Sequence, residues 1–137
     1  MILPRQGDRI RVLLIAEMCN PAWTSVPLVG YNLAKALSQN PELDVTLVTQ
    51  VRNKNYLQND PIQKYARVHY INNEFVAYPF HLLSKMLRFS GVSWTIDTAS
   101  MLPSYLIFEK LVQQQFGNQL AQGRFDIIHR ITPLSRE

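Results

Sequence analysis

Two short segments of the chain are almost continuously apolar, and between them the apolar positions change to a helical spacing. Residues 11–16 (RVLLIA) and 44–49 (DVTLVT) are rich in leucine and β-branched residues, as strands buried on both faces are. One helical stripe between them consists of Val26, Val29, Gly30, Leu33, Ala36 and Leu37. The pattern predicts a strand, an irregular loop over residues 17–25, a helix over residues 26–39, and a second strand.

The second half of the chain continues with the same kinds of element. A polar connector over residues 52–66, with room for a short helix, precedes a third predicted strand at residues 67–71. A long helix is predicted over residues 103–122, and a fourth strand over residues 125–131. The apolar stripe of this long helix consists of Phe108, Leu111, Val112, Phe116 and Leu120. Gly123 then follows at the position where a helix commonly ends in the left-handed conformation.

This order of elements predicts an α/β fold with a Rossmann-like, doubly wound parallel sheet. Right-handed crossovers make 3-2-1-4 the expected strand order, with helices on both faces. The 137 residues suit a single domain of ordinary size. Doubly wound sheets normally continue past a fourth strand, so we expect the chain to be the first half of a larger protein.

Composition and charge narrow the class of protein. Hydrophobic residues make up 47% of the chain and charged residues 18%, which indicates a globular chain and not a disordered one. The single cysteine, Cys19, excludes an internal disulfide and fits a reducing, cytoplasmic compartment. No apolar run approaches the ~20 residues of a membrane span, and the N-terminus lacks a signal peptide's apolar region. The net charge of +4 is scattered, so nucleic acid is not an expected partner.

The sequence lacks the motifs of several common enzyme classes. The loop at residues 17–25 contains no glycine, which disfavours a dinucleotide-binding oxidoreductase and a Walker A nucleotide-binding loop. His69, His81 and His129 have no metal-ligand spacing, so no metal cofactor is expected. Ligands of parallel α/β sheets bind outside the carboxyl ends of the strands. The candidate site therefore lies at residues 17–25, 50–53 and 129–135.

The residues around these loops resemble a known family. A helix reading LVGYNLAKALSQ before DVTLVTQ, with FDIIHRITPLS further along, is similar to the N-terminal domain of family 4 glycosyltransferases. The resemblance implies a retaining GT-B enzyme, in which two Rossmann-like domains face each other across a cleft. It implies transfer from a nucleotide sugar to a sugar or lipid-linked acceptor, with the donor held mainly by a C-terminal domain absent from this chain. This chain alone would then be the inactive, acceptor-side half.

The family's motifs carry over to this sequence in part. The family's glycine pair at the start of the first helix aligns with Thr24 and Ser25, where free helix N–H groups and hydroxyls could bind a phosphate. The pattern Asp, two apolar residues, His matches at residues 126–129, ending in His129, but the family's second His is Ile131 here. We therefore name no catalytic residue.

The predicted substrate-binding residues are Trp23, Thr24, Ser25, His129 and Arg130, and each has a structural alternative. Trp23 offers a stacking face for a sugar or base, or simply covers the rim of the first helix. Thr24 and Ser25 could serve only as helix caps, His129 as a hydrogen-bonded structural histidine, and Arg130 as a solvated arginine. If these alternatives hold, the chain is a non-catalytic Rossmann-like module that binds a ligand or a protein.

The middle of the chain carries one further pattern. Residues 79–89 place apolar residues at helical spacing beside the basic residues Lys85 and Arg88. Such a helix could pack on the sheet, or it could lie on an anionic membrane surface and bring the cleft to a lipid-linked acceptor. The second interpretation predicts a peripheral contact with the inner face of the membrane.

Overall fold

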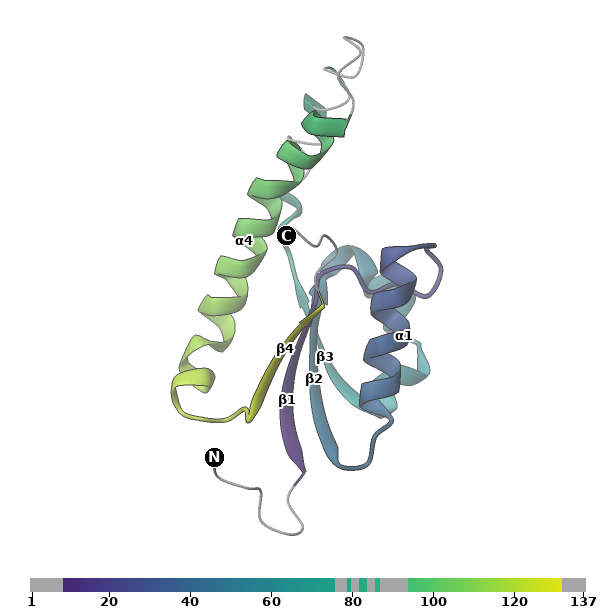
Figure 1. Ribbon diagram of the computed structural model, residues 1–137, viewed down its shortest axis with the longest axis vertical. Helices are drawn as coiled ribbons and strands as arrows, with labels where there is room; N and C mark the ends of the chain where they lie inside the picture. The colour runs from purple at the N-terminus through teal and green to yellow at the C-terminus, as the bar shows by residue number, and fades with distance from the viewer. Residues whose placement is uncertain (1–8, 76–78, 80–81, 84–85, 87–93, 132–137) are drawn as a thin grey trace.

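The computed structural model describes residues 9–75, 79, 82, 83, 86 and 94–131. Within them the chain forms one parallel sheet whose strand order is β3-β2-β1-β4 (Figure 1). The strands are β1 (Ile10–Ala16), β2 (Leu43–Gln50), β3 (Ala66–Ile71) and β4 (Ile127–Ile131). The predicted fold class and strand order are therefore confirmed.

Helices cover both faces of the sheet, as a doubly wound fold requires. Helix α1 (Val26–Ser38) lies on one face and the long helix α4 (Trp94–Ala121) on the other (Figure 1). The connector between β2 and β3 forms three short turns, η1 (Val51–Asn53), α2 (Lys54–Leu57) and η2 (Pro61–Lys64).

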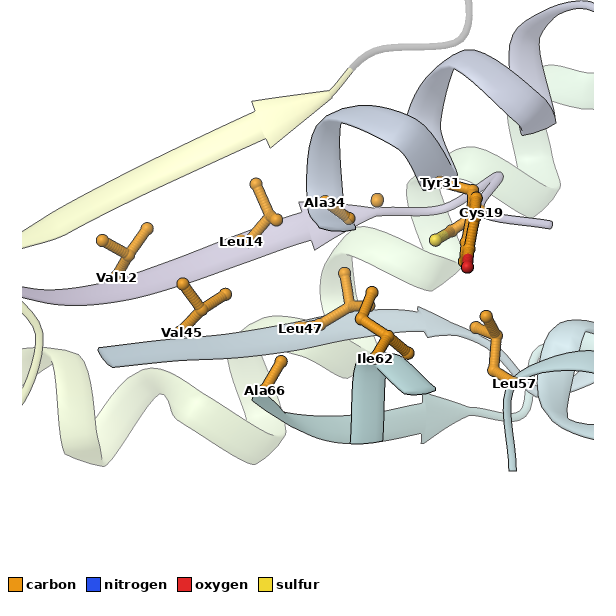
Figure 2. Packing of buried hydrophobic residues seen from close by; sticks show 11 residues of the cluster. Val12, Leu14, Cys19, Tyr31, Ala34, Val45, Leu47, Leu57, Ile62 and Ala66 are labelled. Carbon is orange, nitrogen blue, oxygen red and sulfur yellow. The ribbon is translucent and has the colours of Figure 1, made fainter. Parts of the chain in front are cut away.

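The alternation of side chains along the strands divides the core into two clusters, one on each face. Figure 2 shows the cluster on the α1 face, which includes Val12, Leu14, Cys19, Tyr31, Ala34, Val45, Leu47, Leu57, Ile62 and Ala66. The cluster on the α4 face joins the strand residues Leu13, Val48 and Ile71 to Phe108, Val112 and Phe116 of α4. The predicted α4 stripe is confirmed, because Leu111 and Leu120 pack at its margin.

The predicted stripe of α1 is confirmed only in part: Gly30 is buried and Leu37 packs against the core, but Val29, Leu33 and Ala36 are exposed. The buried residues of this helix are Pro27, Gly30, Tyr31, Ala34 and Ser38, whereas Val29 is 62% exposed. Two of these residues carry hydroxyl groups that find partners inside. Tyr31 donates to the carboxylate of Asp60 at 3.0 Å, and Ser38 donates to the carbonyl oxygen of Ala34 at 2.6 Å. Because both hydroxyls are hydrogen-bonded, their burial carries little penalty, and α1 can turn the side with Tyr31 and Ser38 to the sheet.

The boundaries of α4 and β4 also differ from the sequence-based prediction. Helix α4 begins at Trp94 and passes through Pro103, whereas the sequence pattern predicts that the helix starts at Pro103. Proline inside a helix removes one backbone hydrogen bond, and the rest of this 28-residue helix tolerates that loss. Strand β4 begins at Ile127, and Phe125 instead stacks edge-on against Phe116, with ring centroids 6.3 Å apart.

Candidate functional site

The loop that follows β1 is held against the start of α1. Gly30 lies so close to this loop that a Cβ atom there would overlap the carbonyl oxygen of Met18. The backbone N–H of Asn20 also donates to the carbonyl oxygen of Pro27 at 3.0 Å. The loop and the first turns of α1 therefore form one rigid unit at the carboxyl edge of the sheet, where ligands of parallel sheets bind.

Hydrogen bonds among three buried side chains, those of Asn20, Thr49 and Asn53, hold this loop in place. The amide of Asn53 donates to the backbone oxygen of Glu17 at 3.2 Å and to the hydroxyl of Thr49 at 2.9 Å. Asn20 in turn donates to the side-chain oxygen of Asn53 at 3.3 Å. All of these polar groups are buried and paired with one another, so the hydrogen bonds tie residues 17–20 to the end of β2.

A buried carboxyl group lies at the end of β1. Glu17 is 8% exposed and accepts a 2.6 Å hydrogen bond from the side-chain amide of Gln50. Burial raises the pKa of Glu17, while the charges of Arg52 and Arg130 and the bond from Gln50 act in the opposite direction. A carboxyl group with a raised pKa at a strand end is a candidate for proton transfer or for binding a polar ligand.

Arg130 lies on the α4 face of the sheet with unsatisfied donors. Its guanidinium donates to Glu109 at 2.8 Å and stacks over the ring of Tyr105, 4.3 Å from the centroid. Its Nε and second terminal nitrogen are buried and have no hydrogen-bond partner among the described residues. These two N–H groups can therefore donate to a polar group that approaches this edge of the sheet.

Similar unpaired atoms occur along the same edge of the sheet. The alternation of β2 puts Gln50 on the same face as Val48, and Asn73 after β3 donates to the backbone and hydroxyl oxygens of Ser104 in α4. The remaining side-chain oxygens of Gln50 and Asn73 are buried without a partner among the described residues. A polar row consisting of Asn73, Gln50, Glu17 and Arg130 thus crosses the four strand ends beneath α4.

The sequence-predicted residues Trp23, Thr24 and Ser25 lie in the same loop. Trp23 is half-buried and packs edge-on against Tyr56 of α2, with ring centroids 6.0 Å apart. Thr24 and Ser25 are exposed. Ser25 occupies the N-cap position, as predicted, but its hydroxyl makes no capping hydrogen bond. Its backbone has φ 63° and ψ −132°, in the left-handed half of conformational space that favours glycine.

The two predicted residues of β4 are not brought together. His129 pairs in register with Leu14 of the α1-face core, whereas Arg130 pairs with Ile15 and contacts α4. Neighbouring residues of a strand point to opposite faces, so the two side chains are separated by the sheet. Only His129 shares a face with α1, and it is exposed there.

Within residues 9–75 and 94–131 and the few described between them, no helix combines the length and apolarity of a membrane span. The same residues contain no group of three His, Cys, Asp or Glu side chains that could hold a metal ion. Neither a protein-family model nor a curated protein nor a solved structure matches this chain.

Proposed function

We propose that this chain is the N-terminal, acceptor-side domain of a retaining GT-B glycosyltransferase similar to family 4. The observation that supports this proposal most strongly is the backbone of Ser25. Ser25 aligns with one glycine of the pair that the family carries at the start of its first helix. Its φ of 63° is the conformation for which glycine is normally required, and the chain keeps that conformation without the glycine.

The conformation of Ser25 is unfavourable for a residue with a side chain. A left-handed conformation costs a non-glycine residue about 1–2 kcal/mol, and such strain persists mainly where function needs the geometry. It leads directly into α1, in which Val29 makes the first helical hydrogen bond, to the carbonyl of Ser25. The N–H groups of Val26 and Leu28 lie outside the helical ladder, and Pro27 has none. This positive helix end suits the diphosphate of a nucleotide sugar.

Side chains near the start of α1 could bind the sugar ring of the donor and the acceptor. Trp23 beside the helix start offers part of an aromatic face to a sugar ring. His129 is exposed on the same face as α1. Arg130 and Glu17 lie at the same carboxyl edge but on the α4 side of the sheet, where they would bind hydroxyl or acidic groups of the acceptor. In the full enzyme a second domain would hold most of the donor and close over this edge.

A peripheral membrane contact belongs to the same proposal. Four of residues 79–89 are described, and all four are helical and exposed: Pro79, Leu82, Leu83 and Met86. The last three are large apolar side chains, as a membrane-facing surface requires. Phe80, Lys85 and residues 87–89 lie outside the described residues. The proposal places the protein in the cytoplasm with this segment on the inner face of the membrane, where it would meet a lipid-linked acceptor.

The test of the proposed function uses the polypeptide with its donor domain and a panel of nucleotide sugars. Thr24→Tyr should fill the phosphate site and greatly reduce transfer, with little change in stability because Thr24 is exposed. The matched control is Asn32→Tyr, at an exposed position of α1, which should leave transfer unchanged. Equal activity of the two variants would contradict the site. Turnover of about 1 per second or more by residues 1–137 alone would contradict the two-domain interpretation.

A second candidate function rests on a different observation. An open hollow of about 340 Å³ lies between the end of β3 and α4. Its lining residues are Tyr70, Ile71, Asn72, Leu111, Gln114 and Gln115. A hollow of this volume could hold part of a small molecule, and it is the basis of the alternative, a non-catalytic ligand-binding module. Ligand binding that Gln114→Ala weakens and Thr24→Tyr does not, without any transfer, would identify that alternative.

A further inference from the structure

Two residues of α4 hold the side chain of Arg130 in one orientation. Its terminal nitrogen Nη1 donates to the carboxylate of Glu109 at 2.8 Å. The flat guanidinium group also stacks over the ring of Tyr105, with its central carbon 4.3 Å from the ring centroid. The ion pair at one edge and the aromatic ring against one face together fix the plane of the group. Arg130 therefore loses little side-chain freedom when a further partner binds it.

The other edge of the same guanidinium group carries two N–H donors that lie side by side. These donors, Nε and Nη2, are buried and have no hydrogen-bond partner among the described residues. Their N–H bonds point in the same direction, and such a fork binds two oxygens of one carboxylate or phosphate. The whole side chain of Arg130 is 20% exposed. The fork thus lies near the surface, and an anion reaches it when neighbouring side chains shift.

Two carboxyl groups lie near the fork of Arg130, and neither occupies it. Glu109 binds the other edge of the guanidinium group, and Glu17 accepts its 2.6 Å hydrogen bond from Gln50. Burial raises the pKa of Glu17, which favours the neutral form of this carboxyl group. The guanidinium of Arg52 adds a second positive charge close to Glu17. The charges around the fork are therefore compatible with one further anion.

Hydrogen-bond acceptors continue this site along the polar row. The side-chain oxygens of Gln50 and Asn73 are buried without a partner among the described residues. Because β1 lies between β4 and β2, Gln50 is two strands from Arg130, or about 10 Å at the usual strand spacing. A hydroxyl group can donate to either oxygen. The row therefore offers two donors to an anion at one end and acceptors to hydroxyl groups at the other.

We propose that the fork of Arg130 binds the anionic group of a polyhydroxylated ligand whose hydroxyls donate to Gln50. The anionic group is a carboxylate or a phosphate monoester, so the ligand is a sugar acid or a sugar phosphate. A neutral sugar binds less tightly, because charge-assisted bidentate hydrogen bonds are the stronger ones. The identification of this ligand with the acceptor rests on the proposed function. The anion site itself does not depend on sugar transfer.

The test titrates the protein with glucuronate, glucose 6-phosphate and glucose, and follows the side-chain Nε–H resonance of Arg130 by NMR. We expect at least one of the two acids to shift this resonance and glucose to leave it unmoved. A shift with glucuronate alone identifies a carboxylate ligand, and a shift with glucose 6-phosphate alone identifies a phosphate ligand. A resonance that neither acid moves would overturn the proposal.

Two variants separate the fork from its positive charge. Arg130→Lys keeps the charge but removes the fork, and it should weaken binding of the acid about tenfold or more, as backbone amide shifts measure. Arg67→Lys is the matched control, because Arg67 also lies in a strand and pairs with a carboxylate, that of Asp44, at 2.9 Å. The control should leave binding unchanged. Equal losses in the two variants would show that the anion responds to net charge alone, and would overturn the proposal.

Glu109→Gln keeps the proposal testable if Arg130→Lys does not fold. The amide oxygen of glutamine can still accept from Nη1, so the guanidinium group keeps its orientation while the neighbouring negative charge is lost. This variant should bind the acid several-fold more tightly, and weaker binding would contradict the site. Binding of the acid without transfer to it, by the polypeptide with its donor domain and a panel of nucleotide sugars, would support the anion site and contradict only the proposed function.

Discussion

Replacing Ser25 by glycine tests how much free energy the positive φ of this residue costs the folded protein. The Ser25 hydroxyl makes no capping hydrogen bond and the residue is exposed, so the substitution removes no described contact. Relief of the left-handed conformation should contribute about 1–2 kcal/mol, and the greater freedom of glycine in the unfolded chain should offset about 0.5–1 kcal/mol of this. We expect Ser25→Gly to raise the free energy of unfolding by roughly 0.5–1 kcal/mol.

Urea unfolding measures this difference. With a slope of about 1–3 kcal/mol per molar urea, the midpoint should rise by a few tenths of a molar unit. Thr24→Gly is the matched control, because Thr24 is the exposed neighbour and does not have a positive φ. Glycine there should lower the midpoint through the unfolded-state entropy alone. A Ser25→Gly variant that is destabilised as much as Thr24→Gly would refute the assignment of strain to Ser25.

Two further predictions concern the buried groups beneath the loop. Asn53→Ala should lower the free energy of unfolding by about 2–4 kcal/mol, because it leaves the amide of Asn20 and other buried groups unpaired. A thermal or urea midpoint unchanged from that of the parent protein would contradict this prediction. Glu17→Gln should stabilise the protein at pH 7 but not at pH 4. Burial raises the pKa of Glu17 above its ordinary value of 4.5. The favourable contribution of this carboxyl group to folding is therefore present below that pH and is lost as the pH rises through the folded-state pKa. Unfolding of both proteins at the two pH values checks this, and an equal difference at both would count against it.

The fold could be predicted from the sequence because its signals are local and repeated. The runs RVLLIA and DVTLVT fall within β1 and β2, and the handedness of crossovers then leaves few orders for four strands. Gly123 has φ 64° just beyond α4, as its position after the last turn predicted. Such features depend on residues within a few positions of one another, which is why periodicity alone identifies them.

The direction of α1 and the polar row could not be predicted in the same way. The buried side of α1 depends on Asp60, which accepts from Tyr31 across 29 positions of sequence. The partners of Glu17 lie more than 30 positions away, in Gln50 and Asn53. Single polar residues in loops carry no pattern that identifies such partners. The separation of His129 from neighbouring Arg130, by contrast, follows from strand alternation alone and is therefore predictable from the sequence.

The lone cysteine provides a chemical reporter for the loop. Cys19 is fully buried between β1 and α1, and burial raises the pKa of its thiol to about 12 (Figure 2). Burial protects Cys19 in two ways: it keeps the reagent away, and it keeps the thiol protonated, whereas only a thiolate reacts readily. An alkylating reagent can therefore modify Cys19 only in molecules whose loop has opened. The alkylation rate of the native protein therefore measures the free energy of that opening, at the place where a substrate would bind. A ligand that binds this edge should slow the alkylation in proportion to its occupancy, with no label added to the protein.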